Sequence, residues 1–181
     1  MKLLKNRAVA IIITVVCSIS ALLCGVHFSL ARQCSKIEAG FYDGVVYDGY
    51  KHPSIDEQLS ERCAASLGII SMLDDDTAKE LTEARRALLD AETISEKCTA
   101  NDKLQRAYER VKPFIGTSEA EKEYISAMDN TQRLINDSGY NDSICLYDKT
   151  VLNAFPIRLL KNIVNAKLPE GFGLRYELGL K

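Results

Sequence analysis

Residues 8–31 read AVAIIITVVCSISALLCGVHFSLA, a run without a formal charge. At about 1.5 Å per residue, a helix of this length spans about 36 Å and exceeds the roughly 30 Å hydrocarbon core of a bilayer. The basic residues before it are Lys2, Lys5 and Arg7. Because basic residues favour the cytoplasmic side of a membrane, we expect residues 1–7 to stay in the cytoplasm and the following chain to be exported.

We expect this run to be an uncleaved signal anchor, because the apolar core of a cleaved signal peptide is shorter, about 7–15 residues. Two other fates stay open. Ser29-Leu30-Ala31 has the small–x–small pattern of a signal-peptidase site. Cys24 is a candidate for lipidation, although Leu23 stands where a lipid-attachment motif has a small residue. The predicted localisation is the cell membrane, single-pass, with a cytoplasmic N-terminus and an extracytoplasmic C-terminal domain.

The size and charge of the exported part restrict its class. Of the 181 residues, about 150 follow the apolar run, which is the size of one domain. The net charge is −2, so without its three basic N-terminal residues the exported part is near −5. A nucleic-acid partner requires a basic face, so none is predicted. The predicted partners are the membrane, an envelope protein, or a second copy of this chain.

The exported cysteines are Cys34, Cys63, Cys98 and Cys145. They are far apart and form no CxxC pair, which argues against a metal knuckle or a thioredoxin-like site. We expect small buried hydrophobes, while a disulfide between two of them stays open because the compartment permits it. The acidic run at residues 74–76 lacks the alternating ligands and central glycine of a calcium loop. No metal or cofactor is predicted.

The exported sequence predicts an all-α fold, in which the N-terminal transmembrane helix precedes a long antiparallel bundle of three to four helices. Apolar residues recur every three or four positions over 55–73 and 81–115, the latter read as one long helix with a polar patch at 99–102. A third stretch, 124–155, is either one bent helix or two abutting ones around Gly139. A short amphipathic helix is expected at 157–167, and no strand is predicted.

Helix start and stop signals agree with this assignment. Ser54 with Glu57, and Ser118 with Glu121, have the spacing of capping boxes. Pro113 ends the long helix before it. The resulting organisation is a cytoplasmic N-terminus 1–7, a transmembrane anchor 8–31, an aromatic and glycine-rich linker 32–53, a bundle 54–167 and an extended tail 168–181.

The linker contains two Tyr-Asp-Gly repeats, at 42–44 and 47–49, and Asp-Gly pairs predict turns. Its aromatic residues are Phe41, Tyr42, Tyr47 and Tyr50. These rings either close the end of the bundle, lie at the headgroup level, or form a platform for a ligand or glycan.

A family resemblance lies near the end of the bundle. Residues 139–156, GYNDSICLYDKTVLNAFP, resemble the C-terminal hallmark of the LemA family. The hallmark residues matched here are Tyr140, Asn141, Tyr147, Asp148, Phe155 and Pro156. Ala84-Arg85 is similar to the family's alanine–arginine segment, and Leu59 with Arg62 to its earlier leucine–arginine motif. The proline–asparagine pair that usually follows that motif is absent, because Ser66-Leu67-Gly68-Ile69-Ile70 stands there.

The resemblance implies a membrane-anchored bacterial protein with a long helical bundle outside the cytoplasm, and it transfers no catalytic residue. From spacing alone, Tyr140 and Tyr147 share a face, and we expect Phe155 to continue it and fill the bundle end.

The leading functional hypothesis is a non-enzymatic interaction or scaffolding module of the envelope. Two alternatives stay open. The first is an envelope glycan or peptide hydrolase with Asp43 and Asp48 as acid and base. The second is a structural homo-oligomer at the membrane surface, because small residues such as Ser20 and Gly25 allow two spans to pack closely.

Overall fold

A computed structural model describes residues 7–47 and 49–173, and it is mostly helical, as predicted. The chain divides into two compact units. The first contains the chain up to Lys36 together with Leu146–Pro169, and the second contains Ile37–Cys145 and the residues from Glu170 onward. Two helices, α1 and α6, pass from one unit into the other.

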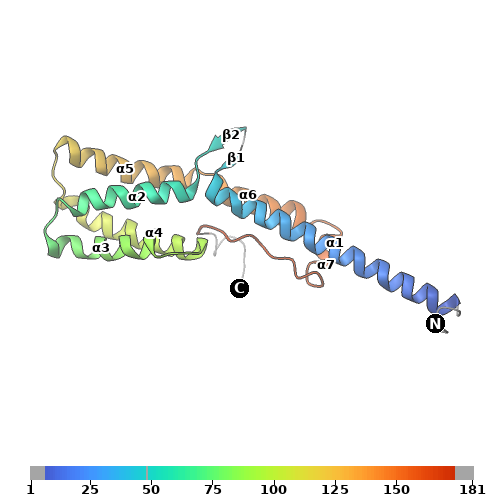
Figure 1. The fold of residues 1–181 in the computed structure, drawn as a ribbon. Helices are drawn as coiled ribbons and strands as arrows, with labels where there is room; N and C mark the ends of the chain where they lie inside the picture. The colour runs from blue at the N-terminus through green and yellow to red at the C-terminus, as the bar shows by residue number, and fades with distance from the viewer. Residues whose placement is uncertain (1–6, 48, 174–181) are drawn as a thin grey trace. The chain divides into compact units, whose positions relative to one another are not determined.

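Helix α1 runs from Arg7 to Asp43 and includes the predicted anchor (Figure 1). It continues without a break through most of the predicted linker. Its most apolar 18-residue window has a mean hydropathy of 2.7, and none of that window is buried. In the described part of the chain, α1 is the one helix long and apolar enough to cross a membrane, as a single-pass anchor or a signal sequence would.

The rest of the first unit packs on the end of this apolar stretch. It comprises the last turn of α6 (Tyr140–Tyr147), the π-helical turn η3 (Asp148–Leu152) and α7 (Ile157–Leu160). The Tyr147 hydroxyl donates a hydrogen bond to the Leu30 carbonyl (3.3 Å), and His27 Nδ1 donates to the Val164 carbonyl (2.6 Å). Of the helix predicted at 157–167, only Ile157–Leu160 is regular α-helix.

The second unit is built on a bundle of helices α2 to α5, whose successive members run in alternating directions (Figure 1). Their bounds are Ile55–Ile70 for α2, Asp75–Leu89 for α3, Ile94–Val111 for α4 and Glu119–Asn136 for α5. Helix α2 packs against α5 and α3, and α3 packs against α4. The core side chains include Leu59, Ile69, Leu81, Leu88, Leu104, Tyr108, Met128 and Ile135. Burying each contributes about 1.5–3 kcal/mol.

The predicted helix starts are present. Ser118 and Glu121 form a reciprocal capping box at α5. Ser54 caps α2 by accepting a hydrogen bond from the Glu57 amide (3.2 Å), while its own hydroxyl donates to the Phe41 carbonyl (3.0 Å). Helix α4 ends at Val111, and the 3-10 turn η2 (Lys112–Phe114) follows it, as the proline at 113 predicts.

The single long helix predicted over 81–115 is wrong. The chain leaves the helix after Leu89 and starts again at Ile94, where Thr93 and Glu96 form a second reciprocal capping box. The predicted polar patch lies instead inside α4, where Asn101 is buried. The apolar spacing continues across the break, which is why periodicity alone missed it.

The prediction of no strand is also wrong. Strand β1 (Val45–Tyr47) pairs antiparallel with β2 (Tyr50–His52), with Val45 opposite His52. Strands of three residues are too short to show alternation. The turn prediction is confirmed, because Gly44 and Gly49 have φ of +83° and +78°.

Candidate functional site

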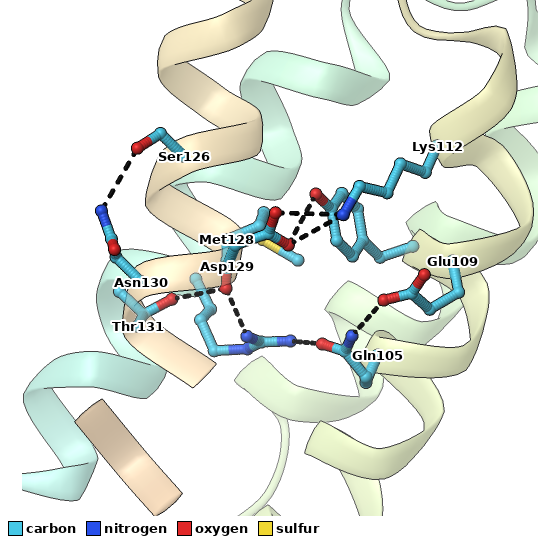
Figure 2. Close-up of polar contacts among 10 residues, drawn as sticks. Gln105, Glu109, Lys112, Ser126, Met128, Asp129, Asn130 and Thr131 are labelled. Atoms are coloured by element: carbon cyan, nitrogen blue, oxygen red, sulfur yellow. Dashed lines mark hydrogen bonds and ion pairs between the residues drawn. The ribbon is translucent and has the colours of Figure 1, made fainter. Parts of the chain in front are cut away.

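Arg62 is the most unusual residue of the bundle, because its side chain is 0% exposed. It extends from α2 to residues of α4 and α5. One guanidinium nitrogen, Nη1, donates a hydrogen bond to the Met128 carbonyl of α5 (2.8 Å). The other, Nη2, donates to Gln105 Oε1 of α4 (2.6 Å). One arginine therefore joins three helices (Figure 2).

Two carboxylates balance this buried charge from a distance. Gln105 Nε2 donates to Glu109 Oε1 (2.6 Å), so an amide links the guanidinium to an exposed carboxylate (Figure 2). The Tyr108 hydroxyl donates to Asp129 Oδ1 (3.0 Å), and Lys112 Nζ pairs with Asp129 Oδ2 (3.0 Å). We call Arg62, Gln105, Tyr108, Glu109, Lys112, Met128 and Asp129 the arginine network.

Burial decides how these groups titrate. It lowers the pKa of Arg62 from 12.5 to about 10, while the charge of Asp129 acts in the opposite direction. Burial, with the nearby Asp129 carboxylate, also raises the pKa of Tyr108. At neutral pH the guanidinium is charged and the phenol is neutral, so neither group is poised for proton transfer.

The core around Arg62 carries polar atoms that the described structure leaves without a hydrogen bond. These are Arg62 Nε, Gln58 Oε1 and Asn101 Oδ1. Each such buried atom costs about 1–3 kcal/mol. Gln58 lies one turn before Arg62 on α2, and Asn101 one turn before Gln105 on α4. In some helical proteins, buried polar groups of this kind fix the register in which helices pair.

The alanine–arginine pair supports the same helix. Ala84 is buried on α3, and Arg85 Nε donates a hydrogen bond to the Cys63 carbonyl of α2 (2.9 Å). Cys63 is a buried thiol, and burial raises its pKa, which Arg85 and Arg62 oppose. Both arginines therefore act on main-chain carbonyls, and Cys63 behaves as the predicted small hydrophobe.

Tyr140 and Asn141 hold the segment that follows Pro169. The Tyr140 hydroxyl donates to the Glu170 carbonyl (2.6 Å), and the Asn141 side chain donates to the Phe172 carbonyl (2.7 Å) and accepts from its amide (3.1 Å). Phe41 packs edge-on against Tyr140, with ring centroids 5.8 Å apart. The buried tyrosine with a bonded hydroxyl agrees with the core position predicted for it.

The later hallmark residues belong to the first unit. Tyr147 is buried, and Asp148 accepts a hydrogen bond from Asn153 Nδ2 (2.9 Å). Phe155 is 82% exposed, so the prediction that it fills the bundle end is wrong. The cause is η3, where the Asn153 amide donates to the Asp148 carbonyl (2.9 Å) across five residues. This wider turn moves Phe155 off the face that carries Tyr147.

The aromatic linker separates into buried and exposed rings. Phe41 is fully buried, whereas Tyr42 and Tyr50 are exposed. Of the predicted carboxylate pair, Asp43 is exposed at the end of α1, and Asp48 lies outside the described residues. The side chain of Tyr47 is likewise outside them.

A hollow on the bundle surface is a further candidate site. Its lining residues are Glu80, Glu83, Ala84, Ala87, Lys103, Arg106 and Arg110. The acids come from α3 and the bases from α4, and Arg110 pairs with Glu80 across it. Among the described residues, no group of three or more histidine, cysteine or acidic side chains is placed to hold a metal ion.

No protein-family model, no curated protein and no solved structure matches this chain.

Proposed function

We propose that this chain is a LemA-like, membrane-anchored helical bundle on the extracytoplasmic face of the bacterial cell membrane, and that it is a non-enzymatic interaction or scaffolding module. The observation that carries the proposal is the exposed apolar part of α1, where Phe28 is 71% exposed. A run of such side chains needs lipid around it. The basic residues at positions 2, 5 and 7 support a cytoplasmic N-terminus.

The course of α1 supports an uncleaved anchor. Ser29-Leu30-Ala31 lies inside a continuous helix that extends to Asp43, well beyond the apolar run. Leu30 is also buried, and its carbonyl accepts the hydrogen bond from Tyr147. Cleavage after Ala31 would remove this contact.

The bundle supports the interaction role. Its buried polar groups bind backbone and amide oxygens, which stabilises the helices and leaves their outer faces available. The hollow between α3 and α4 offers both signs of charge, which suits a peptide or helix of mixed charge.

In-cell crosslinking with mass spectrometry tests this function. The full chain is compared with a version that lacks residues 1–26 and is exported by another signal. The cut is placed before His27 so that the contacts of His27 and Leu30 stay intact. We expect a discrete envelope protein to be captured by the full chain through residues of α3 and α4.

Two results would contradict the proposal. Crosslinks between copies of this chain alone would favour the structural homo-oligomer. Turnover of an envelope glycan or peptide by the purified full chain, lost in Asp43→Asn, would favour the hydrolase.

A further inference from the structure

Three large apolar side chains of the first unit are largely exposed among the residues that the structure describes. Phe155, Leu159 and Ile163 are 82%, 64% and 67% exposed. Helical main-chain bonds link Ala154 to Arg158, Ile157 to Lys161 and Leu160 to Val164, although only α7 is regular helix. Leu159 and Ile163, four residues apart, therefore lie on one face. Together with the exposed Phe155, which precedes the cis bond to Pro156, we call them the apolar stripe. Val164, on the other side, is buried.

The charge of residues 151–167 differs from that of the part of the second unit that precedes them. Residues 151–167 contain Arg158, Lys161 and Lys167 and no acidic residue, a formal charge of +3. Residues 37–145 contain 12 basic and 22 acidic residues, a formal charge of −10. An apolar stripe accompanied by cations is the pattern of a helix that lies in a membrane interface, where anionic headgroups attract the cations.

The depth of the segment along α1 agrees with this pattern. Arg7 must stay near one surface of the bilayer, and His27 lies 20 residues further along the helix, a rise of about 30 Å. That rise equals the roughly 30 Å thickness of the hydrocarbon core, so His27 reaches the opposite interface. There its Nδ1 donates to the carbonyl of Val164, which is adjacent to Ile163. The stripe therefore begins where α1 leaves the lipid.

We infer that residues 154–167 are a second membrane contact, an amphipathic segment that lies in the bilayer interface beside α1 and binds anionic lipid. Phe155, Leu159 and Ile163 enter the apolar boundary, and Arg158, Lys161 and Lys167 bind lipid phosphates. The inference deepens the proposed function and rests on α1 being a membrane anchor. It also explains why the motif phenylalanine is exposed.

The chain contains no tryptophan, so a single introduced tryptophan reports its own surroundings. The experiment uses Phe155→Trp in the full chain, reconstituted into vesicles of phosphatidylcholine with phosphatidylglycerol, with and without brominated acyl chains. Ile19→Trp, inside the apolar run, is the reference for a tryptophan surrounded by lipid. Phe114→Trp, an exposed phenylalanine of the acidic bundle, is the matched aqueous reference. Leu159→Trp repeats the test should the first variant fold poorly.

The expected result is blue-shifted emission from the tryptophan at 155, with bromolipid quenching between the values of the two references. Quenching should weaken in phosphatidylcholine vesicles and in the triple variant R158Q/K161Q/K167Q. Equal quenching with and without anionic lipid would overturn the lipid-charge part of the inference. Emission like that of the variant at 114 would overturn the whole of it. Blue-shifted but unquenched emission would do so too, because a protein surface would then cover the stripe.

Alkaline carbonate extraction of the same vesicles separates the two claims. If the protein stays with the vesicles and the tryptophan at 155 is unquenched, the anchor stands and the second contact fails. If carbonate releases the protein, the anchor itself is wrong, and the second contact fails with it.

Discussion

At the scale of a single residue, Arg62 links α2 to α4 and α5. Its two hydrogen bonds end on neutral oxygens of other helices, and its Nε has no bond in the described structure. A buried cation without a direct carboxylate partner is costly, so much of its contribution comes from filling space and fixing register.

We expect Arg62→Ala to lower the free energy of unfolding by about 3 kcal/mol, because it removes two hydrogen bonds and leaves a cavity. Arg62→Met keeps most of the volume and removes the buried charge, so we expect it to stay within about 1 kcal/mol of the wild type. Urea unfolding of the detergent-solubilised full chain, followed by tyrosine fluorescence, measures both.

Arg86→Ala is the matched control, because Arg86 is an exposed arginine of α3 that pairs only with Asp90 in the next turn. We expect its effect to stay below about 0.5 kcal/mol. A loss in Arg62→Met as large as that in Arg62→Ala would mean that the hydrogen bonds themselves, rather than packing, hold the three helices together.

Single residues were predictable from sequence where their role is local, and less so where it depends on a partner helix. Tyr140 and Cys63 were placed correctly on buried faces because spacing determines a face. Two signals pointed to Arg62: its position three residues after Leu59 on the apolar side of α2, and the resemblance of this pair to a leucine–arginine motif. Its partners Gln105 and Met128 come from 43 and 66 residues away, which no local pattern reveals.

At the scale of the element, the capping box of α4 separates two helices that periodicity joins. Because Thr93 accepts a hydrogen bond from the Glu96 amide (3.2 Å), we expect Thr93→Ala to lower the free energy of unfolding by about 1 kcal/mol. Ser118→Ala removes the equivalent cap of α5 and should cost a similar amount. Urea unfolding measures both, and an unchanged Thr93→Ala variant would mean that packing alone sets the start of α4.

The same cap predicts a dependence on acid. Hydrogen bonds from the Thr93 and Glu92 amides lower the pKa of Glu96 below its ordinary value of 4.5. The folded state therefore favours the ionised form, so this contribution is complete above the ordinary pKa and is lost as the pH falls through the lowered one. We expect Glu96→Gln to flatten the stability profile in this acid range. Unfolding curves measured across it test this, and a slope equal to that of the wild type contradicts it.

The hairpin β1–β2 shows that a short element depends on turn geometry as well as on the pattern of apolar residues. The positive φ of Gly44 and Gly49 agrees with the predicted turns, yet the three-residue strands on either side of Gly49 carry no readable alternation. At Gly44 a Cβ atom would lie 2.4 Å from the His52 carbonyl oxygen, so backbone approach as well as positive φ requires glycine there. The all-α class was thus predictable from apolar residues that recur every three or four positions. The break between α3 and α4 and the hairpin depend instead on capping and turn geometry.

At the scale of the whole molecule, the first unit depends on residues from both ends of the sequence. Tyr147 and Val164 bind the carbonyl of Leu30 and the ring of His27. If α1 is an uncleaved anchor, the protein purified from membranes should have an intact mass that includes residues 1–31.

Two exported truncations, one starting at His27 and one at Arg32, isolate the contribution of the Tyr147–Leu30 and His27–Val164 contacts. We expect trypsin to cut rapidly at Lys149, Arg158 and Lys161 only in the version that starts at Arg32. That version lacks both His27 and Leu30, which bind the segment. Mass spectrometry of the fragments measures this. Equal cutting of the two versions would mean that residues 27–31 do not hold the 146–169 segment, and it would remove the packing argument against cleavage.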